Sequence, residues 1–443
     1  MINRSTRRPM LALGASGVAL SLTLAGCAGG GGGGGGGGDG EEVTISYLVD
    51  NQESTVLVAE ALIEEFESQN EGIQVELETR PQGAEGDNLI KTRLSTGEMN
   101  SVFAYNTGSL MQALNPDQTL VNLDDQEFVG LLDENFVKAV STDNGVYAAP
   151  MGQAMSGSII YNKDVYEELG LEVPQTWDEF IANAEAVKEA GDIAPIVQTY
   201  GDTWTSQLFV LGDFANVLAE DPEWAEKYTN NEAKYVDQPA LAGFQKLEEV
   251  YEKDLLNEDF ASATYADGVA MVATGEGAHY PILTFAASQL SASNPEAADI
   301  VGTFPIPGDN AEDNALTVWM PGGVYIPQST EGAELEAAKK FVEFVTTKES
   351  CDIQGEIVAP TGPFVIEGCE LPAEVPAMVS DQQPYFDEEK TGLALEFSSP
   401  IKGPALEQIT VAVGSGITSA EEGAAQYDED VKKQAQQLGI EGW

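Results

Sequence analysis

From residue 43 onward, short runs of alternating apolar and polar residues are separated by longer runs with apolar residues at helical spacing. Alternation is typical of a strand with one buried face, and apolar residues three and four positions apart indicate an amphipathic helix. Strands that alternate with helices predict an α/β fold, in which a parallel sheet carries helices on its faces. The first part of the pattern predicts strands at 43–49, 73–79 and 102–105 and helices at 54–70 and 88–96.

The pattern continues toward the C-terminus without a repeat of fixed period. About 400 residues of this kind suit two domains better than one core. Thr176 and Glu179 have capping-box spacing, so a helix should begin at Trp177. Further strands are expected at 159–161, 278–280, 301–304 and 324–326, with helices at 177–190, 203–218, 239–253, 265–275, 283–292 and 333–346 and a mainly helical tail at 404–438.

The N-terminal segment has the composition of an export signal. Arg4, Arg7 and Arg8 precede an apolar stretch at 10–24, which is too short for a permanent membrane span. Cys27 stands where signal cleavage is expected, and this arrangement resembles the lipobox of bacterial lipoproteins. The paired arginines are also similar to a twin-arginine signal, but the rest of that pattern is poor, so general secretion is favoured.

The lipobox resemblance implies that residues 1–26 are removed and that Cys27 carries a thioether-linked lipid. The protein would then be anchored to the cell membrane on its extracytoplasmic side. Residues 27–42 form the expected linker, because 29–38 are unbroken glycine and cannot pack side chains. No later apolar run is long enough to predict a second membrane anchor.

The formal net charge of −54 limits the partners of this chain. A chain of such charge repels nucleic acid and anionic lipid, so we expect no nucleic-acid binding and membrane attachment only through the lipid. The acidic residues are spread along the whole sequence, which favours a solvated surface over a metal site.

Cysteine usage predicts one disulfide. Once Cys27 carries lipid, Cys351 and Cys369 are the two that remain of three. In an oxidising exterior we expect these two to pair. Closing a loop of this length stabilises a protein by about 3 kcal/mol in the chain-entropy model.

No catalytic or metal-binding set stands out. His279 is the single histidine, no G-x-S-x-G elbow accompanies it, and a zinc site would lack its usual ligands. We therefore read His279 as a core or cleft residue. Asp309, Glu312 and Asp313 lack EF-hand spacing and read as a solvated loop. The sequence predicts no catalytic residues, no metal and no cofactor.

Several motifs occur in a specific order. Residues 161–180 contain Y-N-K-D, then G-L, then P-Q-T-W-D-E-F, and 146–150 read V-Y-A-A-P. Residues 275–278 read G-E-G-A, and 322–327 read G-G-V-Y-I-P before a helix that ends F-V-T-T-K-E. This order resembles the extracellular solute-binding proteins of ABC sugar importers, the family of maltose-binding protein. His279-Tyr280 departs from the family pattern, in which an apolar residue is commoner at the first position.

The resemblance implies a class II periplasmic-binding-protein-like fold, with two α/β lobes, a hinge of crossing segments and a ligand cleft between the lobes. From the match, one lobe would comprise 43–150 plus 284–330. The other would comprise 151–283 plus 331–443. The crossings are expected near 150–153, 280–284 and 329–332.

A sugar site needs amides and carboxylates for hydroxyl groups and aromatic rings for C–H faces. Ligands of α/β sheets bind at the carboxyl ends of strands, where polar loops follow the first three strands. The family resemblance places a stacking aromatic at Tyr280, and Trp177 reads as packing instead. The full set of candidate ligand contacts is Asn51, Gln52, Tyr105, Asn106, Gln153, Trp204, Tyr280, Trp319 and Glu396.

The leading hypothesis is a monomeric, lipid-anchored receptor that captures a carbohydrate, in particular an oligosaccharide, and delivers it to ABC permease subunits. One alternative keeps the binding fold but holds a cation such as a polyamine or quaternary amine on the aromatic rings. Another is a secreted glycoside hydrolase, since acids are abundant, although no carboxylate pair stands out.

Overall fold

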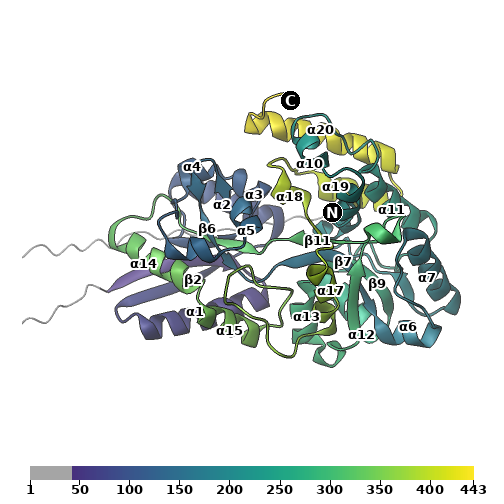
Figure 1. Ribbon diagram of the computed structural model, residues 1–443, viewed down its shortest axis with the longest axis horizontal. Coiled ribbons are helices and arrows are strands. Elements are labelled where there is room, and N and C mark those ends of the chain that lie inside the picture. The colour runs from purple at the N-terminus through teal and green to yellow at the C-terminus, as the bar shows by residue number, and fades with distance from the viewer. Residues whose placement is uncertain (1–41) are drawn as a thin grey trace, which may run out of the picture. The chain divides into compact units, whose positions relative to one another are not determined.

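The computed structural model describes residues 42–443, which fold around two large β-sheets (Figure 1). The expected signal segment at 1–26 and Cys27 lie outside the described residues, as does the linker apart from its last residue. Lipidation of Cys27 therefore stays a prediction. Among the described residues, no helix has the length and hydropathy that crossing a bilayer requires.

The first sheet has the strand order β2-β1-β3-β12-β6. β1 is parallel to both β2 and β3, whereas β12 is antiparallel to β3 and β6. The β-α-β-α-β order expected from the sequence is thus confirmed. The strands are β1 (Val43–Asp50), β2 (Ile73–Arg80), β3 (Val102–Tyr105), β6 (Ala148–Met151) and β12 (Gly322–Tyr325).

Helices cover both faces of the first sheet, because successive side chains of a strand point to opposite faces and both sets are buried here. Tyr47 of β1 packs with Phe66 and Phe341 on one face, with the ring centroids of Tyr47 and Phe341 5.1 Å apart. Leu48 belongs to the cluster on the other face. The helices and short elements of this part are α1 (Glu53–Gln69), α2 (Gly83–Thr96), α3 (Ser109–Gln112), α4 (Pro116–Thr119), η1 (Glu127–Leu131), α5 (Glu134–Ala139), α14 (Gly332–Phe344), α15 (Lys348–Ile357) and the hairpin β4 (Ser141–Thr142) with β5 (Gly145–Val146).

The second sheet has the order β13-β11-β7-β9-β8, and β10 also pairs with β7. β7 is antiparallel to β9, β10 and β11, while β8 is parallel to β9 and β13 is parallel to β11. The strands are β7 (Met155–Asn162), β8 (Ala194–Ile196), β9 (Gly277–Leu283), β10 (Val301–Pro305), β11 (Leu316–Trp319) and β13 (Thr391–Leu393).

The helices around the second sheet form the largest hydrophobic cluster of the described residues. α7 begins at Trp177 as expected, with the Thr176 hydroxyl accepting from the backbone N–H of Glu179. The helical elements are α6 (Lys163–Leu169), α7 (Trp177–Ala190), η2 (Thr203–Gln207), α8 (Leu208–Leu211), α9 (Phe214–Glu220), α10 (Trp224–Thr229), α11 (Leu241–Glu252), α12 (Tyr265–Thr274), α13 (Ala286–Ser293), η3 (Pro295–Ala297), η4 (Ala311–Asp313), α16 (Ala377–Ser380), α17 (Gln383–Asp387), α18 (Leu395–Ser398), α19 (Leu406–Gly414) and α20 (Ala420–Leu438).

The chain passes between the two sheets at 152–154, at 320–321 and at 358–376. The crossings expected near 280–284 and 329–332 are wrong, because β9 continues to Leu283 and leads into α13 beside the same sheet.

The expected lobe boundaries change accordingly. β10 and β11 lie within 284–330 but pair with β7, and α14 lies beyond 331 but packs on β1. We therefore propose that the first lobe is 43–151 plus 322–357 and the second lobe is 155–319 plus 377–443.

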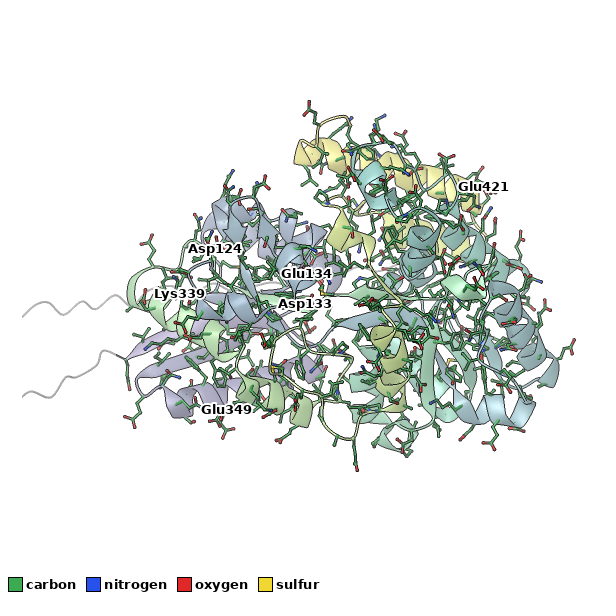
Figure 2. The ribbon with its side chains drawn as sticks, viewed as in Figure 1. Asp124, Asp133, Glu134, Lys339, Glu349 and Glu421 are labelled. Carbon is green, nitrogen blue, oxygen red and sulfur yellow. A yellow bond between two sulfur atoms is a disulfide. The ribbon has the colours of Figure 1, made fainter. Side chains whose placement is uncertain are left out.

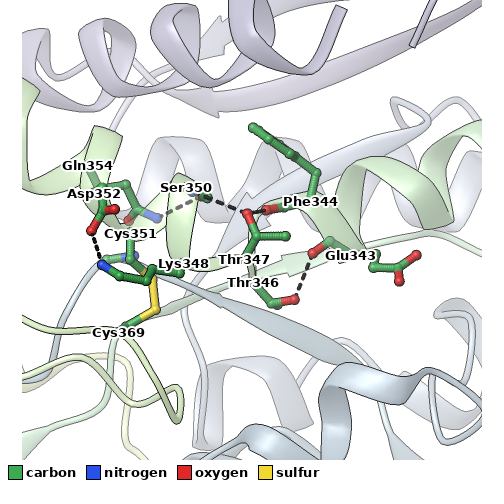
Figure 3. Close-up of a disulfide and its surroundings, with 11 residues drawn as sticks. Glu343, Phe344, Thr346, Thr347, Lys348, Ser350, Cys351, Asp352, Gln354 and Cys369 are labelled. Atoms are coloured by element: carbon green, nitrogen blue, oxygen red, sulfur yellow. Dashed lines mark hydrogen bonds and ion pairs between the residues drawn. A yellow bond between two sulfur atoms is a disulfide. The ribbon is translucent and has the colours of Figure 1, made fainter. Parts of the chain in front are cut away.

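The structure joins Cys351 and Cys369 in the expected disulfide, with a Cα–Cα distance of 5.8 Å (Figure 3). Cys351 lies on α15 of the first lobe, and Cys369 lies in the crossing at 358–376. The bridge therefore ties one crossing segment to the first lobe.

Acidic side chains are distributed over the surface of both lobes, as the sequence indicates. Asp124, Asp133, Glu134 and Glu349 of the first lobe and Glu421 of the second are all exposed (Figure 2). Within residues 42–443, no cluster of three or more His, Cys, Asp or Glu side chains is arranged to hold a metal ion.

Candidate functional site

The carboxyl ends of strands from both sheets meet where the chain crosses between them. In the first sheet, β1, β2 and β3 end at Asp50, Arg80 and Tyr105, beside the start of β12. In the second sheet, β11 ends at Trp319 opposite the start of β7. Because β9 is antiparallel to β7 and β8 is parallel to β9, both end on this side as well. We call these two sets of strand ends the facing edges.

The two lobes touch at one end of the facing edges. Gly108 follows β3 and has a φ of 67°, and a side chain there would collide with the backbone of Glu396 and the ring of Phe397 in α18. Phe397 also packs against the cluster that contains Phe103 and Tyr105. The segment after β13 in the second lobe thus lies directly on the first lobe.

Three half-buried aromatic side chains gather at the second lobe's edge. Trp204 follows β8, Phe285 follows β9, and Tyr265 begins α12. The ring centroids lie 5.4 Å apart for Trp204 and Tyr265, 5.6 Å for Trp204 and Phe285, and 5.2 Å for Tyr265 and Phe285. Since all three are partly exposed, this aromatic trio can offer a ring face to a ligand. Sequence reasoning identified Trp204 but missed Tyr265 and Phe285.

The phenol of Tyr265 adds a polar atom to the trio. Its Oη is buried and has no hydrogen-bond partner among residues 42–443, and its backbone N–H donates to Asp202 Oδ2 at 2.7 Å. Burial raises the pKa of Tyr265 well above its usual value, so the phenol stays a neutral donor. An unpartnered phenol beside ring faces suits a ligand with both C–H and hydroxyl surfaces.

Tyr280 is placed differently from the prediction. Its side chain is fully buried in β9, and its Oη shares a hydrogen bond of 2.6 Å with Thr199 Oγ1. The strand continues past Tyr280 to Leu283, so the aromatic residue at the strand's end is Phe285. Tyr280 therefore packs within the second lobe and does not join the other candidates.

Trp319 and Glu396 lie side by side in the structure. Their side chains bond each other and are not free to contact a ligand. The indole N–H of Trp319 donates to Glu396 Oε1, and Lys402 Nζ lies 2.9 Å from Glu396 Oε2. The Trp319 ring also lies against Gly157 in β7, where a Cβ would collide with it. Trp319 is 7% exposed, so its ring mainly fills space between β7 and α18.

The candidates of the first lobe lie at its facing edge. Asn51 is exposed, and Gln52 is half-buried, with its N–H donating to Asp50 Oδ1 at 2.9 Å. Asn106 is exposed, and its carbonyl accepts from Tyr325 Oη at 2.9 Å. Tyr105 is buried, and its phenol lies near the carboxylate of Asp87.

Gln153 lies in the first crossing rather than on either edge. It is buried, its Nε2 has no partner, and Thr361 Oγ1 approaches its Oε1 at 3.5 Å. Arg80, the last residue of β2, was not predicted as a site residue, although it occupies the same position as Asp50 and Tyr105 at the strand ends.

Surface hollows exist elsewhere, but they lack aromatic side chains. A hollow of about 320 Å³ lies beside α12. One of about 470 Å³ lies between α19 and α20 and is lined by Ala405, Ile409, Ala425, Gln426, Glu429, Asp430 and Lys433. We favour the facing edges because ring faces beside polar groups suit a ligand that has both C–H faces and hydroxyl groups.

His279 has no place in this site. It is fully buried, its Nδ1–H donates to the Pro195 carbonyl at 2.6 Å, and its Nε2 accepts from Tyr166 Oη at 2.7 Å. Burial lowers the pKa of His279 to about 4. Its surroundings are those of a neutral core histidine.

A pH-dependent loss of stability should follow from His279. Its pKa is lower in the folded state than in the unfolded chain, so its stabilising effect is complete above the ordinary value near 6.5 and is lost as pH falls toward 4. The loss should reach the order of 3 kcal/mol. We expect a His279→Gln variant to lose less stability than the original protein between pH 7 and pH 4.5, measured by denaturant titration. Equal losses in both would contradict this.

The comparisons with known proteins agree with the two-lobed arrangement. Residues 19–350 match the family model of the bacterial extracellular solute-binding proteins. The chain belongs to this family. A multiple sugar-binding protein of Streptococcus mutans is 25% identical over 335 residues, which is 73% of this chain and 76% of that protein. The melibiose/raffinose/stachyose-binding protein MelE of Bacillus subtilis is 23% identical over 332 residues, 73% of this chain and 75% of MelE.

Solved structures of this family share the fold. A chitin oligosaccharide binding protein superposes with a TM-score of 0.77 at 20% identity, covering 90% of this chain and 100% of that chain. The solute-binding protein RafE in complex with raffinose gives a TM-score of 0.71 at 21% identity, covering 89% of this chain and 99% of RafE. The expected two-lobed α/β class of the solute-binding proteins is confirmed.

Proposed function

We propose that this protein is an extracytoplasmic, lipid-anchored receptor that captures an oligosaccharide between its lobes and delivers it to an ABC permease. The observation that carries the proposal is the aromatic trio of Trp204, Tyr265 and Phe285, half-buried at a facing edge. Aromatic rings stack on the C–H faces of sugars, while the polar ends of β1–β3 supply hydrogen-bonding groups for hydroxyls.

Family membership supports the proposal, because relatives over about three quarters of the chain are named as sugar-binding proteins. Ligand that contacts both lobes favours the state in which they are closed on each other. The permease would then distinguish the loaded receptor by its closed shape. No catalytic role is part of the proposal, and Cys27 would supply the membrane attachment.

Thermal unfolding of the purified protein tests the ligand class. The panel holds mono- and oligosaccharides together with polyamines and betaines, which probe the cation alternative. A ligand at 100 times its Kd stabilises a protein by about 2.7 kcal/mol, which moves the unfolding midpoint by several degrees. We expect a shift with an oligosaccharide class that is recovered unchanged by chromatography. A shift with amines alone, or release of shorter sugars, would contradict the proposal.

A further inference from the structure

Arg80 is an unusual cation for this protein. Arg80 and Arg93 are the two arginines among residues 42–443, and Arg93 pairs with Glu78 at 2.6 Å on the surface. Arg80 is 6% exposed, yet no described carboxylate lies within 4.0 Å of its guanidinium. Its Nη1 donates to the Pro81 carbonyl at 3.0 Å, and its Nε is buried without a partner. A buried charge without a partner is costly in a folded protein.

The guanidinium also packs against the positive end of a helix. α2 begins at Gly83, and no side chain caps its N-terminus. A Cβ on Gly86 in the first turns would lie 2.5 Å from Arg80 Nη1, so the guanidinium lies directly against this end. Free N–H groups and the helix dipole make a helix N-terminus favourable for an anion and unfavourable for a cation. Glu85 lies in the first turn of α2, but no described carboxylate is within 4.0 Å of the Arg80 guanidinium, so this cation has no direct anionic partner.

Tyr105 completes the arrangement from the neighbouring strand end. The guanidinium carbon of Arg80 lies 5.6 Å from the centroid of the Tyr105 ring. Tyr105 is 3% exposed, and its phenol lies near the carboxylate of Asp87. Burial, and then the nearby charge of Asp87, raise the pKa of Tyr105 above its usual value, so it remains a neutral donor. The buried Nε of Arg80, which has no hydrogen-bond partner among residues 42–443, thus lies beside the Tyr105 ring at the facing edge of the first lobe.

We propose that Arg80, Tyr105 and the N-terminus of α2 form a subsite for a carboxylate of the ligand, so that the protein takes an acidic, uronic-acid-containing oligosaccharide. The planar fork of a guanidinium matches a carboxylate, and a charge-assisted hydrogen bond is stronger than a neutral one. A chain with a net charge of −54 repels anions, and a buried arginine at the site offsets that repulsion locally. This inference rests on the proposed function and specifies its ligand.

The test compares matched ligands by titration calorimetry with the purified protein. The probes are oligosaccharides of three uronic acids, each paired with its neutral, carboxyl-reduced counterpart. We expect the protein to bind one uronate at least about 10-fold more tightly than its neutral counterpart. Arg80→Gln should weaken binding of that uronate by about 10- to 100-fold and weaken binding of the neutral counterpart by a smaller factor. Arg93→Gln removes the same charge from the same lobe and should change neither affinity.

Stability separates a ligand-binding role of Arg80 from a structural one. Without ligand, Arg80→Gln should unfold at a temperature no lower than the original protein, because it removes a buried charge that lacks a partner. A clear drop in the midpoint, or equal affinity for uronate and neutral forms, would overturn the carboxylate subsite. Binding of neutral oligosaccharides without any uronate would overturn it and leave the proposed function intact. If no carbohydrate binds, the proposed function fails as well.

Discussion

Removal of the Cys351–Cys369 disulfide should lower the free energy of unfolding by about 3 kcal/mol, with weaker ligand binding as a second effect. The bridge closes a loop over a sequence separation of 18, which limits the unfolded chain. We would measure denaturant unfolding and ligand affinity for the Cys351→Ala, Cys369→Ala double variant. Alanine is suited to Cys351, which is 1% exposed, because it introduces no buried polar group.

Ligand binding should weaken because the loop between these cysteines holds the hinge. Several polar contacts join it to other segments, and three of them involve residues near the crossings. The Gly152 N–H donates to Gln354 Oε1 at 2.9 Å, the Ala154 N–H to the Pro363 carbonyl at 2.8 Å, and Thr284 Oγ1 to the Thr361 carbonyl at 2.9 Å. The disulfide anchors this loop on α15 (Figure 3). Without the bridge, the ligand must order a freer crossing segment when the lobes close, so we expect affinity to fall several-fold.

Reduction with a phosphine provides the matched control for the double variant. The original protein should acquire the variant's stability and affinity when it is reduced, whereas the variant should not respond to the reductant. An unchanged unfolding free energy in the variant would contradict the predicted restriction of the unfolded chain by the disulfide. Unchanged affinity together with lost stability would mean that the disulfide affects only the unfolded state and not ligand binding.

The sequence predicted local structure well because local structure depends on neighbouring residues. Alternation in residues 43–49 identified β1, and Thr176 identified the start of α7. The predicted lobe boundaries differ from the structure because the sheet to which a strand belongs depends on pairing between distant segments. Nothing in the apolar face of α14 distinguishes packing on β1 from packing on β7.

The site shows the same limit at finer scale. Trp204 was identified because it lies at the start of the helix expected at 203–218. A stacking aromatic was expected at Tyr280, and the half-buried aromatic residue beyond the true end of β9 is Phe285. β9 is buried on both faces from Gly277 to Ile282, so an aromatic residue inside the strand, such as Tyr280, packs in the core. Arg80 was not predicted as a site residue, because the absence of a carboxylate beside it can be recognised only in the three-dimensional structure.

The largest effect on ligand binding is expected in the aromatic trio. Trp204→Ala should weaken oligosaccharide binding by about 10- to 100-fold, since central aromatic contacts dominate recognition and truncation costs about 2 kcal/mol or more. Trp443→Ala is a matched control, because Trp443 is also half-buried but packs near Tyr228 and donates to the Thr229 carbonyl at 2.7 Å. We expect the control to lose stability without losing affinity, measured by titration calorimetry.

A double-mutant cycle would show whether the rings act as one surface. Trp204 and Phe285 are in contact, so their replacements by alanine should not be additive. If one sugar stacks across both rings, the first replacement removes most of the binding free energy of this contact. The second replacement then causes a smaller further loss than it causes in the single variant. Additive losses would mean that the rings hold separate parts of the ligand. Unchanged affinity in both single variants, with folding intact, would place the ligand away from the trio and remove the main support for the proposed function.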